Sequence, residues 1–242
     1  MTPSLKPSTQ AKLRRFAELF PEFYEQFVSS DIQFDNLKLA YQLYTQKTEA
    51  IITADPAGDK TALRLAAKNQ PGLLRDLFGV LAAYNLTAHS LNVYGQVQSP
   101  TLIFIRMNVS RGGKAIAGKT ADNVRRALRE ALEGRFEVEE MLSVEVFESN
   151  RLGSVQTEFY IDKQFHLPAL LIESDEEDGM FFKMTNAICP EKLLVVNANL
   201  LPWRGRTRLI LYVLTEQGKA IPEYRGQKMA ERVKARLNGS ST

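Results

Sequence analysis

Six consecutive residues have the types and spacing of a turn that binds an anion at the start of a helix. They are Asn69, Gln70, Pro71, Gly72, Leu73 and Leu74. The first N–H groups of the following helix have no partners within it, and the helix dipole adds positive charge there. Gly72 has no Cβ, so a ligand can come close. We expect this Pro-Gly turn to suit a carboxylate, for example that of a free amino acid. A purely structural turn is the alternative.

A second, altered copy of this stretch occurs later in the chain. We call it the Asp-Gly turn, and its residues are Glu177, Asp178, Gly179 and Met180. Asp178-Gly179 stands where Pro-Gly stands in the first copy. The acidic side chains there disfavour an anion, because like charges repel. The Asp-Gly turn is therefore a second candidate ligand site, for which an amine or a metal ion is the alternative to an amino acid.

The only tryptophan is followed closely by two arginines, in the sequence PWRGRT. Trp203, Arg204 and Arg206 are predicted to form the tip of a β-hairpin. Exposed Trp and Arg are enriched at the centres of protein interfaces, so this hairpin tip is a candidate docking point for a partner protein. A solvated turn is the alternative.

No set of residues in the sequence indicates catalysis. The two histidines, His89 and His166, are isolated, and Cys189 ends a predicted helix, where it suits an inert apolar role. No triad and no familiar metal-ligand spacing is present. We therefore expect neither an enzyme, nor a cofactor, nor a bound metal.

Composition narrows the class of protein further. The 242 residues carry a net charge of +3, which is too small to argue for nucleic-acid binding, and Arg125, Arg126 and Arg129 fit a solvated helix face. A single cysteine allows no internal disulfide and favours a reducing compartment. No apolar run reaches the roughly 18 residues of a membrane span. We expect a soluble protein of the cytoplasm or the plastid stroma.

The apolar periodicity divides the chain into three parts. Residues 1–60 are a helical segment, with helices over 9–29 (broken at Pro21) and 34–48 and a boundary loop over 53–60. The two helices are expected to cover a sheet face or a dimer partner. Residues 61–150 and 151–239 form the other two parts.

Those two parts have nearly the same order of elements. In the first, strands are predicted over 62–67, 88–97, 101–110 and 141–147, with helices over 73–84 and 120–134. In the second, strands are predicted over 155–162, 170–174, 193–201 and 208–215, with helices over 180–189 and 223–237. The first has the βαββαβ order of a ferredoxin-like unit. The second lacks a final strand, and we expect residues 155–162 to supply it, because a bare sheet edge is unfavourable. The predicted class is α+β.

The sequence LRLAAKNQPGLLRDLFGVLAAYNLTAHSLNVY resembles an ACT domain, a small-molecule regulatory module, over about residues 62–149. ESDEEDGMFFKMTNAI looks like a second ACT copy. The chain also resembles the C-terminal tandem-ACT region of bacterial PII uridylyltransferase/uridylyl-removing enzymes, where a linker like FYID also precedes the second copy. The resemblance implies glutamine sensing, and it places Thr87 and His89 beside the ligand.

The chain also departs from that enzyme family. Gly153-Ser154 is not followed by the Asp-x-Asp pair of the nucleotidyltransferase, and neither His89 nor His166 precedes the Asp that the hydrolase needs. The chain therefore resembles the sensor without the enzyme, and stand-alone tandem-ACT proteins, including those of plastids, are the better whole-length analogue.

The sequence thus predicts a non-catalytic regulatory sensor that binds a free amino acid, with glutamine as the first choice. It would form a homo-oligomer and modulate an enzyme of nitrogen or amino-acid metabolism. Two alternatives stay open. The chain could be the regulatory fragment of a larger amino-acid-metabolism enzyme, or an ACT scaffold that joins proteins and binds no ligand.

Overall fold

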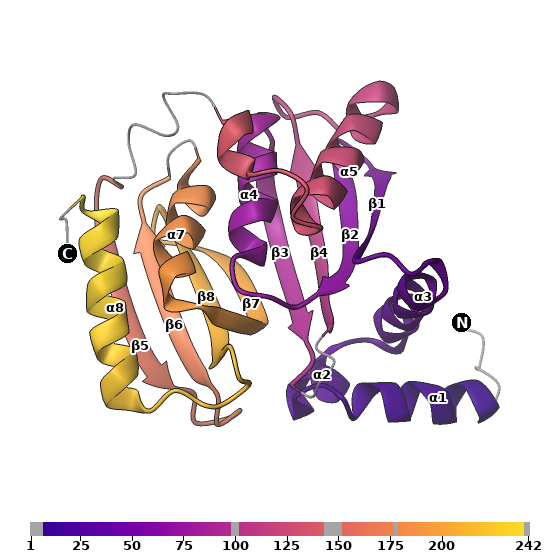
Figure 1. The fold of residues 1–242 in the computed structure, drawn as a ribbon, viewed down its shortest axis with the longest axis horizontal. Helices are drawn as coiled ribbons and strands as arrows, with labels where there is room; N and C mark the ends of the chain where they lie inside the picture. The colour runs from indigo at the N-terminus through magenta and orange to yellow at the C-terminus, as the bar shows by residue number, and fades with distance from the viewer. Residues whose placement is uncertain (1–6, 98–101, 143–151, 177–178, 240–242) are drawn as a thin grey trace.

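A single antiparallel sheet of eight strands runs through the part of the chain that the structure describes (Figure 1). The structure is a computed structural model, and it describes residues 7–97, 102–142, 152–176 and 179–239. In order across the sheet, the strands are β1 (Ala50–Ala57), β2 (Lys60–Lys68), β4 (Leu102–Ser110), β3 (Thr87–Gly95), β7 (Leu193–Trp203), β8 (Arg206–Thr215), β6 (Pro168–Ser174) and β5 (Val155–Ile161). The α+β class expected from the sequence is confirmed.

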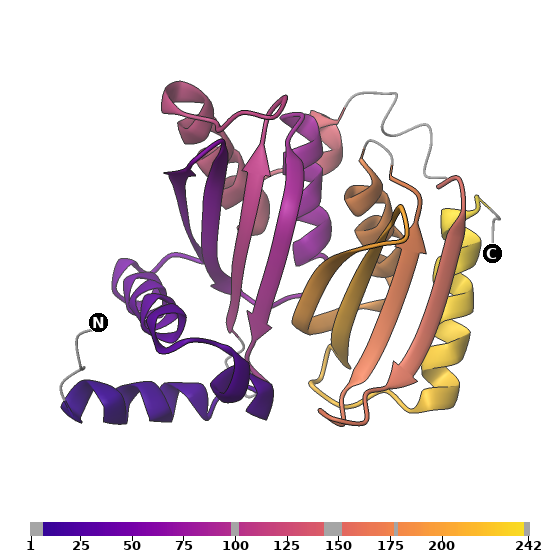
Figure 2. The same ribbon diagram turned by 180° about the vertical axis from the view of Figure 1, so that it is seen from behind.

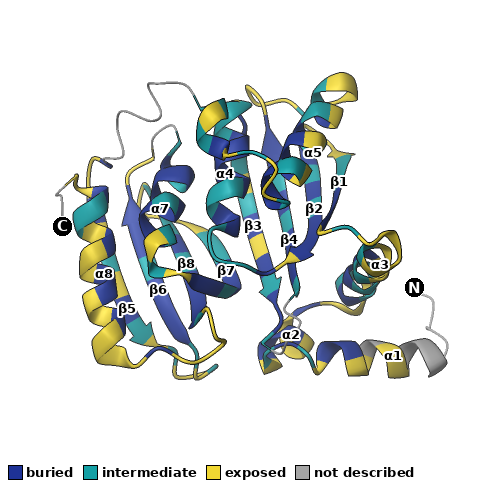
Figure 3. Ribbon diagram, in the orientation of Figure 1, coloured by how far each residue is buried: buried dark blue, intermediate teal, exposed yellow. Residues whose placement is uncertain are grey.

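Four amphipathic helices cover one face of this sheet (Figure 1). They are α4 (Leu73–Ala83), α5 (Gly118–Leu132), α7 (Met180–Ile188) and α8 (Glu223–Leu237). Their apolar sides and the facing strand residues form one continuous core, whereas the outer side of α8 is exposed (Figure 3). Two short 3-10 helices, η1 (Val138–Met141) and η2 (Cys189–Glu191), follow α5 and α7. Burial of one apolar stripe per helix is what holds these helices on the sheet.

The prediction of a loop over residues 53–60 is wrong, because most of that stretch belongs to β1. Strand β1 pairs along its length with β2 and forms the edge of the sheet. Pro56 suggested a loop, but an edge strand tolerates a residue without an N–H group. Gly58 makes the turn between the strands with φ = 66°. The strand predicted over 141–147 is not seen in the described residues of that stretch. Met141 ends η1, and residues 143–147 lie outside the described residues.

The two halves of the sheet have the same chain order of strand, strand, helix, strand, strand, helix. In the second half, β5 pairs with β6 at the far edge, which is the position expected for residues 155–162. In the first half, β1 has the equivalent position beside β2. Each half therefore takes its edge strand from the segment that precedes it. The sequence predicts this arrangement for the second half only.

The N-terminal helices α1 (Pro7–Ala17), α2 (Glu22–Phe27) and α3 (Ser30–Gln46) pack on the other face of the sheet. Their aromatic side chains contact Ile51, Ala66 and Phe104, which alternate along the strands with residues of the main core. The expectation that these helices cover a sheet face is confirmed. Helix α2 also reaches the second half, because Phe23 stacks edge-on against Phe165.

The halves meet where β3 and β7 pair antiparallel in the middle of the sheet. The side-chain amide of Asn197 donates to the backbone oxygen of Val93 at 2.9 Å, which adds a cross-strand bond. Above the sheet, α4 packs against α7, and the rings of Phe78 and Phe181 lie 5.1 Å apart. This β3–β7 junction positions the Pro-Gly turn.

Candidate functional site

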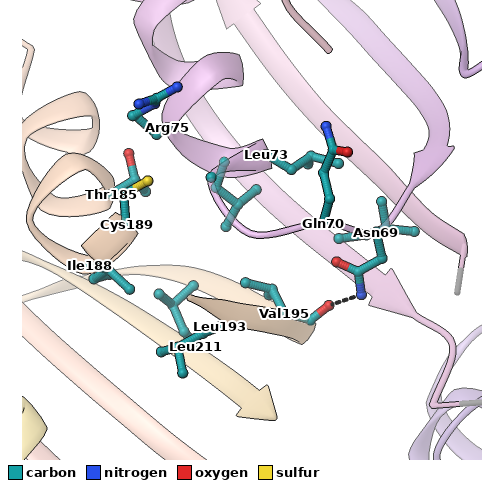
Figure 4. A pocket seen from close by; sticks show the side chains of 13 residues that line it. Asn69, Gln70, Leu73, Arg75, Thr185, Ile188, Cys189, Leu193, Val195 and Leu211 are labelled. Atoms are coloured by element: carbon teal, nitrogen blue, oxygen red, sulfur yellow. Dashed lines mark hydrogen bonds between the residues drawn. The ribbon is translucent and has the colours of Figure 1, made fainter. Parts of the chain in front are cut away.

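The Pro-Gly turn joins β2 to α4 and packs against the second half of the molecule (Figure 4). Gly72 precedes the helix with a left-handed φ of 87°, which explains why glycine is needed there. Asn69 is buried, and its side-chain amide donates to the backbone oxygen of Val195 in β7 at 2.9 Å. A Cβ at Gly72 would lie 3.4 Å from the sulfur of Cys189. The turn of one half is thus fitted to the backbone and side chains of the other.

A small cavity lies at this contact, between the Pro-Gly turn, the end of α7 and the start of β7 (Figure 4). Its walls are mainly apolar, and its polar lining residues are Asn69, Gln70, Arg75, Thr185 and Cys189. The cavity volume is about 30 Å³, where about 10–15 Å³ is enough to hold one water molecule. A free amino acid is larger than that. An amino acid can therefore enter only if the turn and β7 move apart.

The charged group at the rim of the cavity already has partners. One guanidinium nitrogen of Arg75 lies 2.7 Å from a carboxylate oxygen of Asp76, and the other lies 3.4 Å from Glu139. Burial raises the pKa of the Asp76 carboxyl, and the bond from Arg75 opposes this shift. Burial also raises the pKa of the Cys189 thiol. A ligand carboxylate would compete with Asp76 and Glu139 for Arg75.

The side chain of Gln70 is directed to a neighbouring helix. Its amide nitrogen donates to the backbone oxygen of Leu132 at 3.3 Å, at the C-terminal end of α5. This bond satisfies one of the carbonyls that a helix end leaves without a partner. Gln70 therefore contributes to holding α5 as well as to lining the cavity.

Thr87 and His89 do not lie near the Pro-Gly turn, although the resemblance grouped them with it. They are exposed at the beginning of β3, whereas Asn69 lies beside Gly95 at its end. Eight residue steps of about 3.3 Å separate the two ends of this strand, or roughly 26 Å. His89 shares a hydrogen bond of 2.7 Å with the hydroxyl of Ser110. Because β3 and β7 are antiparallel, the start of β3 lies toward the end of β7 that is farther from Val195.

The Asp-Gly turn resembles the Pro-Gly turn in the backbone geometry of the glycine that precedes the helix. Gly179 precedes α7 with φ = 69°, as Gly72 precedes α4. Met180 is buried in the main core, and Glu177 and Asp178 lie outside the described residues. The correspondence between the two glycines, inferred from the sequence, is present in the fold.

The hairpin tip presents only part of the predicted docking point. Trp203 is 42% exposed, and the guanidinium of Arg208 lies over its ring at 4.1 Å. Arg206 is directed back to the sheet, where it lies 2.8 Å from Glu173 and 3.1 Å from Asp175. Arg206 is therefore a structural ion-pair residue, which leaves Trp203 and Arg204 as the candidates for docking.

Glu173 makes the stability of this corner dependent on pH. Its buried carboxylate accepts from Arg208 at 2.5 Å and from Arg206 at 2.8 Å, and the Arg208 bond in particular holds its pKa below the ordinary value of 4.5. The unfolded chain therefore takes up this proton more readily than the folded chain. The stabilisation is fully present above pH 4.5 and is lost as the pH falls through the folded-state pKa.

We expect Glu173→Gln to lower the free energy of unfolding at pH 7 by about 1.5–3 kcal/mol, the usual contribution of a hydrogen bond to a charged group. The variant should also lose less stability than the wild type between pH 6 and roughly pH 3. Urea unfolding at several pH values measures both effects. Glu158→Gln, on the neighbouring strand β5 and exposed, is the control. Equal effects of the two substitutions would contradict the prediction.

The residues that line the cavity from the second half of the chain could not be predicted from the sequence. Thr185, Cys189 and Val195 line the cavity, yet they are more than a hundred residues from the Pro-Gly turn in the sequence. Cys189 was expected to be an inert apolar residue, and no local pattern marks it. Only the pairing of β3 with β7 brings these residues to the turn.

Comparisons with known proteins do not assign the chain to a family. No protein-family model matches it, and no curated protein matches it either. Within the described residues, no group of three or more His, Cys, Asp or Glu side chains could hold a metal ion. None of the described helices has the length and apolarity needed to cross a membrane.

Proposed function

We propose that this protein is a regulatory sensor that binds a free amino acid where the Pro-Gly turn meets the second half. Glutamine is the first ligand to test. The protein would pass on the bound state to an enzyme of nitrogen or amino-acid metabolism, as part of an oligomer. Its own role would be non-catalytic, and its compartment the cytoplasm or the plastid stroma.

The strand order supports two ACT-like units as the finer description of the fold. Across the sheet, the strands of the two halves follow the orders β1-β2-β4-β3 and β5-β6-β8-β7, which agree with the order in a ferredoxin-like unit. The halves differ from that unit only in chain order, because their edge strand comes first in the chain, whereas the edge strand of a ferredoxin-like unit comes last. Moving one edge strand from the end of a unit to its beginning leaves its place in the sheet unchanged. The left-handed Gly72 and Gly179 at the same point of each half add to this argument.

One observation carries the functional proposal: the Pro-Gly turn is bonded across the junction through Asn69 and Val195. A ligand that replaced this bond would have to separate the turn from β7. Binding would then favour one arrangement of the two halves over another, which is the condition for a ligand to shift a conformational equilibrium.

A scaffold without a ligand is the second candidate, and the size of the cavity favours it. A space of about 30 Å³ admits no amino acid as it stands. In that case the bond between Asn69 and Val195 would simply hold the halves together, and the protein would act through its surfaces.

A thermal-shift panel with the proteinogenic amino acids separates these functions. At about 100 times its dissociation constant, a ligand stabilises the fold by about 2.7 kcal/mol, which raises Tm by several degrees for a chain of this length. We expect a rise with one amino acid or a few related ones. A flat panel at millimolar concentrations would overturn the sensor and favour the scaffold.

The Gly72→Val variant tests the location of the site. Valine there is strained at φ = 87°, and its side chain would extend toward Cys189 at the cavity. Gly58→Val is the matched control, because Gly58 has φ = 66° and no atom within 4 Å of a new Cβ. Both variants should lower Tm through backbone strain, but only Gly72→Val should abolish the rise caused by the amino acid. A ligand response that survives in Gly72→Val would place the site elsewhere.

A further inference from the structure

A row of polar side chains crosses the sheet on the face opposite α4 and α7, the face seen in Figure 2. Thr53 pairs with Arg64, and Arg64 pairs with Arg106 on the next strand. Arg106 pairs with Asn92, which in turn pairs with Asn199 across the junction. Directly opposite residues point to the same side of a sheet. Five adjacent strands therefore present polar groups in one line on this face.

The two arginines in this row are directly opposite one another, which is unfavourable for like charges. A single carboxylate oxygen of Asp35 in α3 lies between them, 3.5 Å from Arg64 and 3.6 Å from Arg106. Charge-assisted hydrogen bonds are usually about 2.7–2.9 Å long, so Asp35 does not bond either guanidinium closely. Arg64 has a close bond of 2.5 Å to the exposed carboxylate of Asp55, and Arg106 has no such bond among the described residues.

Both guanidinium groups also carry a buried N–H group without a partner in the described part of the chain. These are Nε of Arg64 and Nη1 of Arg106, and the buried hydroxyl of Thr53 beside them has no partner there either. Buried donors are nearly always paired in folded proteins, because an unpaired donor loses its hydration without return. The described residues therefore do not fully satisfy the two arginines.

A cavity of about 270 Å³ lies over this part of the row, which is near the lower size of small-molecule sites. Its polar lining residues are Arg64, Arg106, Ser90, Asn92 and Asn108. The backbone N–H and the side-chain amide of Asn108 both donate to the hydroxyl of Ser90, at 3.2 and 3.1 Å. The cavity thus combines two cations with neutral hydrogen-bonding groups, and it is about nine times larger than the cavity at the Pro-Gly turn.

The charges around the cavity leave a positive balance. Three cationic side chains, those of Lys38, Arg64 and Arg106, share two carboxylates, those of Asp35 and Asp55. Lys38 lies 3.5 Å from the other oxygen of Asp35. An incoming anion would therefore meet one unbalanced positive charge and two neighbouring guanidinium groups.

We propose that this cavity binds a small anion that carries a carboxylate or a phosphate group. Arg64 and Arg106 hold the anionic group, and Ser90, Asn92 and Asn108 hold the polar remainder of the molecule. Asp35 occupies the edge of the site and competes with the ligand for both arginines. This site lies on the other side of the sheet from the amino-acid site, so the inference does not rest on the proposed function.

Isothermal titration calorimetry of the full chain at constant ionic strength tests the proposal, with inorganic phosphate and citrate as the two probes. We expect saturable binding of at least one probe. Arg106→Gln should weaken it about tenfold or more, the effect of losing a hydrogen bond between charged groups. Asp35→Asn should tighten it, because it removes the competing carboxylate. A purely structural role of these residues would not produce a gain in affinity.

Arg125→Gln is the matched control, because Arg125 is an exposed arginine on α5 paired with Asp122. It changes the net charge as Arg106→Gln does and should leave the affinity unchanged. Binding of phosphate alone or citrate alone would support the proposal and identify the anionic group. Absence of saturable binding to both probes, or equal weakening by Arg106→Gln and Arg125→Gln, would overturn it. The rise in Tm caused by an amino acid can also be measured in Arg106→Gln, and it tests the site at the Pro-Gly turn independently of the anion site.

Discussion

Gly95→Ala is expected to destabilise the protein by about 1–3 kcal/mol, the usual cost of overpacking. A Cβ on this last residue of β3 would lie 2.5 Å from the backbone oxygen of Val195 and 3.0 Å from the Cα of Val196. Gly95 is not among the glycines with positive φ, so the backbone itself would accept alanine. The obstacle is another strand's backbone, which cannot rotate away as a side chain can. The strands of the junction must separate to make room.

Urea unfolding at pH 7 measures this effect, and Gly153→Ala is the control. A Cβ at Gly153 would meet only one side-chain oxygen, that of Asp175 at 3.9 Å, and Gly153 also lacks a positive φ. The same change of side chain should therefore be nearly neutral there. Equal midpoints for the two variants would show that the junction yields without cost, and the prediction would be wrong.

The same variant links the junction to the proposed site. The new Cβ would lie 3.1 Å from the side-chain nitrogen of Asn69, which donates to Val195. Space for alanine is thus gained by weakening the bond that closes the small cavity. If the sensor proposal is correct, Gly95→Ala should also change the dissociation constant of the amino acid, because the ligand has to separate these same groups.

Much of the fold could be predicted because helices and inner strands show clear periodic patterns. The boundary strand β1 was missed because Pro56 and Gly58 are residues of loops, and only the edge position of β1 makes the proline harmless. Residues 155–162 were placed at an edge by a different argument, the need to cover an open strand. The place of residues 155–162 thus follows from the strand order of the whole unit, whereas the loop over 53–60 was predicted from local composition alone.

The candidate sites show the same limit more strongly. Gly72 was found because a left-handed glycine before a helix has a local sequence signal. Cys189 and Val195 were not, because their nearness to Gly72 depends on which strand edges meet. The arginine row was also missed, since Arg64 and Arg106 come together only through strand register. Local chemistry is readable in a sequence, but the partner of a site is set by sheet order.

Gly226→Ala is the second substitution expected to have a large effect, and it tests the core of the second half. A Cβ on Gly226 in α8 would lie 1.9 Å from the ring of Phe159 in β5, closer than any real contact. Alanine at a helical position normally gains up to about 1 kcal/mol over glycine. Here the overlap should outweigh that gain, and we expect a net loss of about 1–3 kcal/mol in the free energy of unfolding.

A double-mutant cycle with Phe159→Leu separates crowding from helix propensity. Phe159 is 5% exposed, so Phe159→Leu alone should also destabilise the protein by leaving space in the core. In the double variant, the alanine would occupy part of that space, and the loss should be smaller than the sum of the single losses by about 0.5–3 kcal/mol. Strict additivity would mean that the ring does not limit the approach of α8. The close contact of this helix with β5 would then not be what requires glycine at this position.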